Sequence, residues 1–464
     1  MDYNGKKIAI VGLARSGLAA AKLLIEMGAD VFVSDTADTP ELRRRAEELQ
    51  GLGAKIELGG HSNSPLREVS EIVLSPGVPT DIPILLWAKA NRPELPIISE
   101  VELGYRFVKG KIIGITGSNG KSTTVSLLGA IFDTAGFESY VVGNIGRPLC
   151  DVALEASEDS ILCVELSSFQ LESIYHFRPF VACILNLSPD HLDRHYEEET
   201  YYAAKERIFV NQTNDDYAVL SADDSRLSRM GEGIAANLLR FSCGAIDGPG
   251  AFVNEGSIVM RKPDGDVVPV LDIDELGIPG PHNLANACAA VACTVPFNLN
   301  IDALAEALRE FGGLPHRLQT VGRINGISFI NDSKATNVDA LECALNSFDV
   351  PLVLIAGGYD KGADFKPLRN LVGQKAKHVV LIGDTAKRIE TDWTSAVSME
   401  HASSLDDAVL KAKAAAVPEG IVLLAPGCAS FDMFKNFEDR GEQFTEIVGR
   451  LSGVGSVTKQ PKEG

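Results

Sequence analysis

Short apolar runs alternate along the chain with longer segments of helical periodicity, a pattern typical of α/β proteins with parallel sheets. In the first part, residues 6–12 and 30–35 are predicted to be buried strands, and residues 18–28 the helix between them. A further apolar run at 71–77 completes this region. The stretch 93–99 contains two prolines and predicts a linker to the next region.

The second part opens at residues 111–132, where a strand, a glycine-rich loop and a helix follow one another. Later apolar runs predict further strands, at 161–166, 181–187 and 217–221. Residues 240–275 are rich in glycine and short β-like runs, which predicts a small side sheet. Residues 280–293 are expected to be a loop followed by an alanine-rich helix.

The third part begins near Leu314 and repeats the alternation of strands and helices. Its apolar runs predict four strands, at 327–332, 351–357, 378–383 and 421–427. A chain of 464 residues exceeds what one hydrophobic core usually organises. We therefore predict three α/β domains, at 1–99, 100–313 and 314–464.

The composition limits the compartment and the partners. A net charge of −20 repels nucleic acid and anionic lipid, so neither is an expected partner. The eight cysteines include no C-x-x-C pair, which fits a reducing compartment. Arg15 interrupts the first apolar segment, unlike a signal peptide, and no apolar run is long enough to span a membrane. We expect a cytoplasmic protein without a membrane segment.

A candidate phosphate loop, T-G-S-N-G-K-S-T, occupies residues 116–123 between a strand and a helix. Backbone N–H groups of such a loop turn toward phosphate oxygens, and the helix N-terminus adds partial positive charge. Lys121 would reach the β- and γ-phosphates, and a hydroxyl at Ser122 or Thr123 would bind Mg²⁺. Ile115 stands where the standard pattern has glycine, so the loop is a shortened variant. The expected nucleotide contacts are Gly117, Ser118, Asn119, Gly120, Lys121, Ser122 and Thr123.

Two further polar positions follow predicted strands of the same region. Glu165 ends one strand within E-L-S-S-F-Q, where a carboxylate facing a phosphate loop can hold Mg²⁺ or, alternatively, cap a helix. His191 lies within N-L-S-P-D-H-L-D after the next strand. It is either a metal ligand near the transferring phosphoryl group or an ordinary surface histidine.

These strings together resemble the Mur ligases and their relative folylpolyglutamate synthase. The resemblance covers residues 5 to about 450 and implies a Rossmann-like N-terminal domain, a P-loop-type central ATPase domain and a Rossmann-like C-terminal domain. It also implies ATP-dependent formation of an amide through an acyl phosphate. The string D-S-K-A-T-N at 332–337 is most similar to the members that add D-glutamate to UDP-N-acetylmuramoyl-L-alanine. The expected partners are therefore these two substrates, and the chain is expected to be a monomer.

For the central region, the resemblance implies ATP and Mg²⁺, with two ions held by Ser122, Glu165, His191 and Lys205. It gives catalytic roles to Lys121, His191 and Lys205, and places Asn286 near the adenine. Lys205, in Y-Y-A-A-K, would be carbamylated by CO₂. A buried lysine beside cations has a lowered pKa and is neutral enough for that reaction.

For the third region, the resemblance assigns two groups of ligand contacts. The ATP contacts would be Arg317, Asp332 and Lys334. The contacts to the incoming amino acid would be Thr336, Lys361, Ser430 and Phe437. Lys361 and the turn at Ser430 offer two candidate anion sites, which matches the two carboxylates of D-glutamate.

The first region suggests a second interpretation, a dinucleotide-binding dehydrogenase, because G-L-A-R-S-G at 12–17 follows a predicted strand and precedes a predicted helix. A dinucleotide-binding loop needs a second glycine at position 14, where Ala14 stands, so a dehydrogenase is the weaker interpretation. The resemblance instead places the substrate here, with contacts from Ser16, Asp35 and Ser75, and a further one from Asn144.

Two alternative functions remain from the sequence alone. One is a relative that uses another amino acid or a folate-like acceptor. The other is an ATP-dependent binding or regulatory module without ligase activity.

Overall fold

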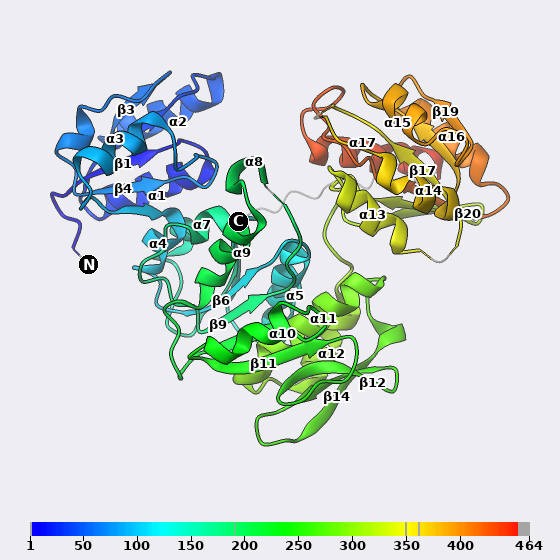
Figure 1. Cartoon of the computed structure of the whole chain (residues 1–464), viewed down its shortest axis with the longest axis horizontal. Helices are drawn as coiled ribbons and strands as arrows, with labels where there is room; N and C mark the ends of the chain where they lie inside the picture. Colours follow the sequence, from blue (N-terminus) through cyan, green and yellow to red (C-terminus); the bar gives the residue numbers. More distant parts are fainter. Residues whose placement is uncertain (1, 191, 349, 361, 453–464) are drawn as a thin grey trace. The chain divides into compact units, whose positions relative to one another are not determined.

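The computed structural model describes residues 2–190, 192–348, 350–360 and 362–452. The chain divides into two compact units, Met1–Leu276 with Leu284–Phe311 and Gly277–Asn283 with Gly312–Gly464. Each unit is built from strands and helices that alternate along the chain, as labelled in Figure 1. This confirms the predicted α/β class, while the domain boundaries at 99/100 and 313/314 stay predictions.

The first sheet has five parallel strands in the order β3-β2-β1-β4-β5. The strands are β1 Lys7–Val11, β2 Asp30–Asp35, β3 Lys55–Leu58, β4 Glu71–Leu74 and β5 Ile97–Ser99. The helices are α1 Arg15–Glu26, α2 Pro40–Gly51, α3 Pro83–Asn91 and α4 Glu100–Tyr105. The prediction of a linker at 93–99 is wrong for its last three residues, because they form an edge strand paired with β4. Ile98 is fully buried there.

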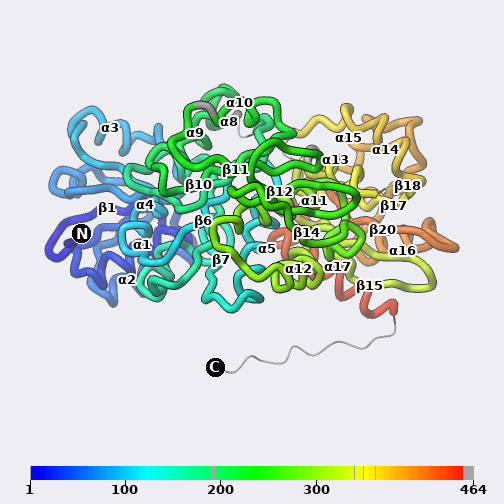
Figure 2. The backbone as a smooth tube through the Cα atoms, turned by 90° about the horizontal axis from the view of Figure 1, so that it is seen from below, coloured from blue at the N-terminus to red at the C-terminus, as the bar shows by residue number. Residues whose placement is uncertain are grey.

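The second sheet, in the same unit, has nine strands in the order β14-β13-β12-β11-β10-β9-β6-β8-β7. The strands are β6 Lys111–Thr116, β7 Ser139–Gly143, β8 Ile161–Glu165, β9 Val181–Ile184, β10 Tyr217–Ser221, β11 Asn237–Ser242, β12 Gly250–Asn254, β13 Ser257–Arg261 and β14 Val267–Asp272. The predicted side sheet at 240–275 is wrong. These strands continue the central sheet, because β11 pairs with both β10 and β12, as Figure 2 lets the reader follow.

The helices of this second sheet begin with α5 Lys121–Thr134, directly after the candidate phosphate loop. The others are α6 Leu149–Val152, α7 Ser168–Leu171, α8 Leu192–His195, α9 Glu198–Glu206, α10 Leu227–Met230, α11 Pro281–Thr294 and α12 Ile301–Glu310. Strands β6, β8 and β9 run parallel, so the loops after them open at one edge of the sheet. That edge is where ligands bind in open α/β sheets.

The third sheet has six strands in the order β15-β16-β20-β17-β18-β19, and only the pairing of β15 with β16 is antiparallel among the described strands. The strands are β15 Gln319–Ile324, β16 Ile327–Asn331, β17 Leu352–Ala356, β18 Ala376–Leu381, β19 Met399–His401 and β20 Gly420–Leu424. The helices are α13 Val338–Asn346, α14 Arg369–Lys375, α15 Ala386–Asp392, α16 Leu405–Ala416 and α17 Phe437–Leu451.

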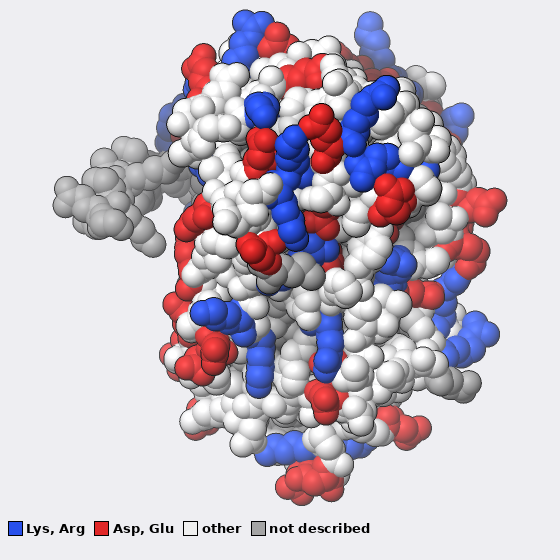
Figure 3. Space-filling view, turned by 90° about the vertical axis from the view of Figure 1, so that its left-hand side faces the viewer, with Lys and Arg blue, Asp and Glu red and all other residues white. Residues whose placement is uncertain are grey.

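The surface agrees with the acidic but mixed composition. On the face drawn in Figure 3, lysine and arginine side chains lie among aspartate and glutamate side chains. Within the described residues, no helix has the length and apolar content needed to cross a membrane.

Candidate functional site

The candidate phosphate loop joins β6 to α5 in a conformation that depends on glycine. Gly120 precedes the helix with φ of +83°, a left-handed conformation that side chains disfavour. A Cβ atom added there would lie 2.2 Å from Oδ1 of Asn286. Asn286, predicted near the adenine, therefore packs directly against the loop.

The loop is braced from the neighbouring strand by residues 186–188. The backbone N–H of Ser118 donates to the carbonyl oxygen of Asn186 at 3.0 Å, and the N–H of Asn119 donates to Asn186 Oδ1 at 2.8 Å. The Ser118 hydroxyl donates to the carbonyl oxygen of Ser188 at 2.8 Å. The Ser118 side chain thus fixes the loop shape. Sequence reasoning missed Asn186, although it lies within the quoted string N-L-S-P-D-H-L-D.

Two lysines meet at one carbonyl oxygen of the loop. Lys121 Nζ and Lys205 Nζ each donate to the carbonyl oxygen of Gly117 at 2.8 Å. Lys205, on α9, is 1% exposed. Burial, and then the positive charge of Lys121, lower the pKa of Lys205 to about 6. The Lys205 amine is therefore mostly neutral at pH 7, as the sequence argument required.

Glu165 lies at the carboxyl end of β8 and is buried. Its Oε1 accepts a hydrogen bond from Asn144 Nδ2 at 2.9 Å, while its Oε2 has no partner among the described residues. A buried carboxylate oxygen without a donor is costly unless a cation or another donor joins it. Glu165 therefore fits a metal ligand. Ser122 is the second residue of helix α5.

Beyond Glu165, the described residues do not form a cluster of metal-binding side chains at the predicted metal site. Among the described residues, no group of three or more His, Cys, Asp and Glu side chains is placed to hold a metal ion. His191 lies outside the described residues. A metal held by Glu165 would need oxygens from hydroxyls, water or phosphate, as Mg²⁺ sites in nucleotide enzymes commonly have.

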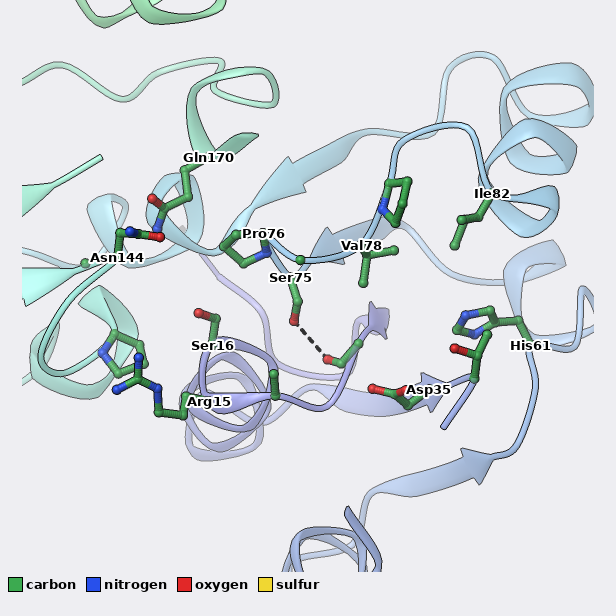
Figure 4. Close-up of a pocket in the computed structure, with 17 residues that line it drawn as sticks. Arg15, Ser16, Asp35, His61, Ser75, Pro76, Val78, Ile82, Asn144 and Gln170 are labelled. Carbon is green, nitrogen blue, oxygen red and sulfur yellow. Dashed lines mark hydrogen bonds between the residues drawn. The ribbon is translucent and has the colours of Figure 1, made fainter. Parts of the chain in front are cut away.

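A cavity of about 440 Å³ lies between the loops of the first sheet and those of the second. It is lined by all four residues predicted to contact the substrate: Ser16, Asp35, Ser75 and Asn144. Figure 4 shows Asn144 and Gln170 toward one end of the cavity, and His61 and Ile82 toward the other. Asn144, which lines the cavity, also bonds Glu165 and thus connects the cavity to the candidate metal ligand.

The turn that forms one wall of this cavity is held by the predicted residues themselves. Asp35 Oδ2 accepts from the Leu13 N–H at 2.7 Å, and the Ser75 hydroxyl donates to the Gly12 carbonyl oxygen at 2.9 Å. A Cβ atom at Gly17 would lie 1.9 Å from that same carbonyl oxygen, so α1 can approach the turn only with glycine there.

The sequence reasoning assigned no role to Gln170 and His61, which line the cavity, or to Arg194, which contacts its wall. Gln170 is fully buried, and its Nε2 has no partner among the described residues, although its Oε1 accepts from the Ser167 N–H at 2.9 Å. Burial lowers the pKa of His61, against the opposing charges of Asp35 and Glu57, and so favours the neutral form of its ring. Arg194 on α8 donates to the carbonyl oxygens of Pro76 and Val78 at 2.8 and 3.1 Å, fixing the opposite wall. Only Gln170 had a sequence signal, as the last residue of E-L-S-S-F-Q.

In the other compact unit, the predicted ligand residues gather at the carboxyl ends of β16 and β20. The loops are joined by the Gly427 N–H, which donates to the Ala335 carbonyl oxygen at 2.9 Å. The structure describes six of the predicted residues: Arg317, Asp332, Lys334, Thr336, Ser430 and Phe437. Lys361 lies outside the described residues.

Two of the predicted ATP contacts in this unit, Asp332 and Lys334, are charged residues whose properties depend on their surroundings. Burial raises the pKa of Asp332 to about 7, against the opposing effects of the Leu318 N–H and the Arg317 charge. Lys334 Nζ lies 3.7 Å from the centre of the Phe437 ring. Phe437, a predicted contact, therefore orients a predicted ATP-binding lysine through a cation–π interaction.

A buried arginine on α17 fixes the two loops that carry these residues. Arg440 is fully buried. Its guanidinium donates to the carbonyl oxygens of Ser333 and Cys428, at 2.8 and 3.1 Å, and to the Ser333 hydroxyl at 2.9 Å. Nothing in the sequence pattern indicates this role, since an arginine in a helix is ordinarily exposed.

Comparison with known proteins adds a match along nearly the whole chain. Three family models match: the Mur ligase MurD-like N-terminal domain at residues 6–98, the Mur ligase middle domain at 115–294, and the Mur ligase glutamate ligase domain at 316–428. A UDP-N-acetylmuramoylalanine–D-glutamate ligase of Acidobacterium capsulatum is 45% identical over 97% of each chain. The enzyme of the same name from Koribacter versatilis is 42% identical over 97% of this chain and 99% of its own.

Solved structures share the fold at lower identity. MurF from Acinetobacter baumannii superposes with a TM-score of 0.61 at 17% identity, covering 95% of this chain and 94% of its own. The UDP-N-acetylmuramate-alanine ligase MurC from Thermotoga maritima gives 0.59 at 21% identity, covering 96% and 99%.

Proposed function

Because this chain belongs to the Mur ligase family, we propose that it joins D-glutamate to UDP-N-acetylmuramoyl-L-alanine, with hydrolysis of ATP to ADP and phosphate. The observation that carries the proposal is the match over 97% of both chains to a relative with this named activity. Mur ligases are ATP-dependent, and the loop at residues 116–123 supplies the element that such an activity needs.

The proposed reaction has two chemical steps. The L-alanyl carboxylate attacks the γ-phosphorus of ATP, which releases ADP and leaves an acyl phosphate. The amine of D-glutamate then attacks the acyl carbon, loses a proton and expels phosphate, leaving the new amide. The first step is needed because a carboxylate is a poor acyl donor, whereas phosphate is a good leaving group.

The phosphate loop would bind and orient ATP. Its N–H groups and the start of α5 favour phosphate oxygens. Lys121 Nζ donates to the carbonyl oxygens of Gly117 and Ser118 in the loop. From this position its ammonium group would stabilise the negative charge on the phosphoryl group during transfer. Asn286 would hold the loop in this conformation from behind Gly120.

The unpartnered Oε2 of Glu165 supports a Mg²⁺ site, with the Ser122 hydroxyl as a second ligand. Bound there, the ion would offset the charge of the phosphates. Asn144 would orient the Glu165 carboxylate by its hydrogen bond to Oε1. His191 is proposed as a ligand of a second ion on the family resemblance alone.

We propose that Lys205 is carbamylated. Its neutral amine would attack CO₂ and lose one proton, leaving an N-carboxylate that carries one negative charge. The reaction places a negative charge close to the Lys121 ammonium, where the neutral amine had none, because both lysines contact the same carbonyl oxygen. With ¹³CO₂, we expect a carbamate carbonyl signal in the ¹³C NMR spectrum of the wild type and none in Lys205→Arg. Equal signals in both would reject the assignment.

The sugar-nucleotide substrate is proposed to occupy the cavity of about 440 Å³. Ser16, Asp35 and Ser75 line its wall on the side of the first sheet, where the uridine diphosphate would lie. At the end nearest Glu165, Asn144 and the unpartnered Nε2 of Gln170 would contact the part of the substrate that bears the carboxylate.

The second compact unit is proposed to supply the remaining contacts. Arg317, Asp332 and Lys334 would bind ATP, and Thr336, Lys361, Ser430 and Phe437 would bind D-glutamate. The three regions 1–99, 100–313 and 314–464 would thus act as substrate, ATP and amino-acid domains of a cytoplasmic monomer.

The decisive experiment measures phosphate release with ATP, Mg²⁺ and UDP-N-acetylmuramoyl-L-alanine, with and without D-glutamate. We expect release only when D-glutamate is present, together with an amide product identified by mass spectrometry. L-glutamate, D-alanine and diaminopimelate serve as competing substrates. A higher rate with one of these, or no amide with any of them, would overturn the proposal.

A further inference from the structure

A second cavity, of about 520 Å³, lies at the opposite end of the central sheet from the phosphate loop. Lys111, which lines it, is the first residue of β6, whereas the phosphate loop follows the last residue of that strand. Phe180, also in its wall, directly precedes β9. The cavity therefore belongs to the amino-terminal edge of the sheet, and neither proposed substrate is assigned to it.

The charged residues that line this cavity are mostly basic: Arg106, Lys109, Lys111, His176, Arg178 and the single acid Asp216. Within the described residues, the two arginines have carboxylate partners. Arg178 Nε donates to Asp216 Oδ2 at 2.6 Å, and Arg106 pairs with Glu71 at 2.8 Å.

The two lysines have no carboxylate partner among the described residues, and both are exposed to solvent. Lys111 Nζ instead lies 4.6 Å from the centre of the Phe180 ring. A cation–π contact of this kind leaves the ammonium protons available to an anion on the open side. Among the charged side chains that line the cavity, four lysines and arginines face a single carboxylate, Asp216, in a protein whose net charge is −20.

We propose that this cavity binds a compact anion of charge −2 or greater, such as a phosphate-bearing or polycarboxylate metabolite. Its volume lies within the range of about 300 to 1,000 Å³ typical of small-molecule sites. Lysine and arginine donors at one wall match the oxygens of such an anion through charge-assisted hydrogen bonds. Outside the proposed nucleotide and amino-acid sites, the net charge of −20 disfavours binding of the same anion to the rest of the surface.

The cavity is also linked to the first sheet through Arg106, which lines the cavity and contacts that sheet. Its guanidinium donates to Glu71, the first residue of β4, and to the Tyr3 hydroxyl at 2.6 Å. An anion in the cavity would compete with Glu71 for Arg106. Binding is therefore expected to weaken the attachment of the first sheet to α4.

The test uses the full chain with Lys121→Ala, so that the phosphate loop contributes less to anion binding. Isothermal titration with inorganic pyrophosphate and, separately, with citrate distinguishes phosphate-bearing from carboxylate ligands. Lys109→Gln/Lys111→Gln in this background should raise Kd at least about tenfold for the anion that binds. The matched control, Lys387→Gln/Lys413→Gln, removes the same charge from α15 and α16 and should leave Kd unchanged.

Lysine acetylation followed by mass spectrometry locates the bound anion independently. In the otherwise unsubstituted protein, the binding anion should protect Lys109 and Lys111 but not Lys387 and Lys413. Protection should fade as the salt concentration rises, because both lysines are exposed. No binding of either anion, equal loss of affinity in the control pair, or binding without protection of Lys109 and Lys111 would overturn the site.

Discussion

Two buried carboxylates, Glu165 and Glu100, show how the same side chain acquires different roles from its surroundings. Each has one oxygen without a hydrogen-bond partner among the described residues. Glu165 faces the edge where the phosphate loop opens, so a cation can reach it. Glu100 lies at the start of α4, where burial raises its pKa to about 7. We therefore expect the first to hold a metal ion and the second to hold a proton.

The role of Glu165 is tested by Glu165→Gln, which keeps an acceptor for Asn144 but removes the negative charge. We expect phosphate release to fall by about 100-fold or more, because a charge-stabilising contact of the transferred phosphoryl group is lost. A Mg²⁺ titration of the residual rate should show half-saturation at a higher concentration. Glu158→Gln, an exposed residue before β8, is the control and should behave as the wild type. An unchanged Mg²⁺ dependence in Glu165→Gln would rule out Glu165 as a ligand.

Glu100 predicts a pH dependence of stability. Its folded pKa of about 7 lies above the ordinary 4.5, so between these values the native state holds a proton that the unfolded state has lost. The free energy of unfolding therefore falls as pH rises through this window, by on the order of 3 kcal/mol. Glu100→Gln does not titrate, and its stability relative to the wild type should rise from pH 5 to pH 8. Urea unfolding at both pH values measures this, and parallel profiles would contradict it.

At the scale of elements, the phosphate loop combines a strained backbone with a close packing contact. Gly120→Ala places a Cβ atom in a left-handed conformation and against Asn286 Oδ1. The conformation alone costs about 1–2 kcal/mol, so we expect Kd for ATP to rise at least about tenfold by isothermal titration.

The matched control for this prediction is Gly136→Ala, just after the same helix. Gly136 has φ of +84° and no atom within 4 Å of an added Cβ. It should therefore lower the melting temperature without changing the affinity for ATP. Equal ATP affinities for Gly120→Ala and the wild type would show that the loop conformation is unimportant for binding.

The strands whose burial is continuous are among those that the sequence predicted. Residues 7–11, 161–165 and 352–356 form mostly apolar strands that have a paired strand on each side in their sheets. The edge strand Ile97–Ser99 was missed because it is only three residues long and follows a proline. The strands at 250–272 were predicted, but their attachment to the central sheet was not, since sheet membership depends on pairing between distant segments.

The candidate site shows the same division between local and distant information. The phosphate loop lies between a strand and a helix that adjoin it in the sequence, and Glu165 ends an apolar strand. Each position could be predicted because its signal lies within a few neighbouring residues. The scaffold that orients them could not. Arg194 and Arg440 act through backbone carbonyl oxygens of segments far away in the sequence, and nothing in their own neighbours indicates those partners.

At the scale of the first compact unit, one buried ionic cluster joins the first sheet to the helix that leads into the second. Arg106, directly after α4, donates to Glu71 of β4 and to Glu102 of α4. Glu102 is fully buried and also accepts from the N–H groups of residues 175–177. The cavity proposed for the sugar nucleotide is lined from both sheets, so this cluster helps to set its shape.

Removing Arg106 should therefore affect both stability and substrate binding. Arg106→Met leaves Glu71 buried without its cation, and we expect a loss of about 3–5 kcal/mol in urea unfolding. Glu71→Gln in the same chain should recover part of that loss, because the uncompensated charge is gone. Arg309→Met breaks an exposed pair with Glu275 and should cost less than about 1 kcal/mol.

In Arg106→Met, the KM for the sugar nucleotide should also rise more than the KM for ATP, since the cavity has walls from both sheets while the phosphate loop belongs to one. Equal changes in the two constants would indicate a general loss of folding instead.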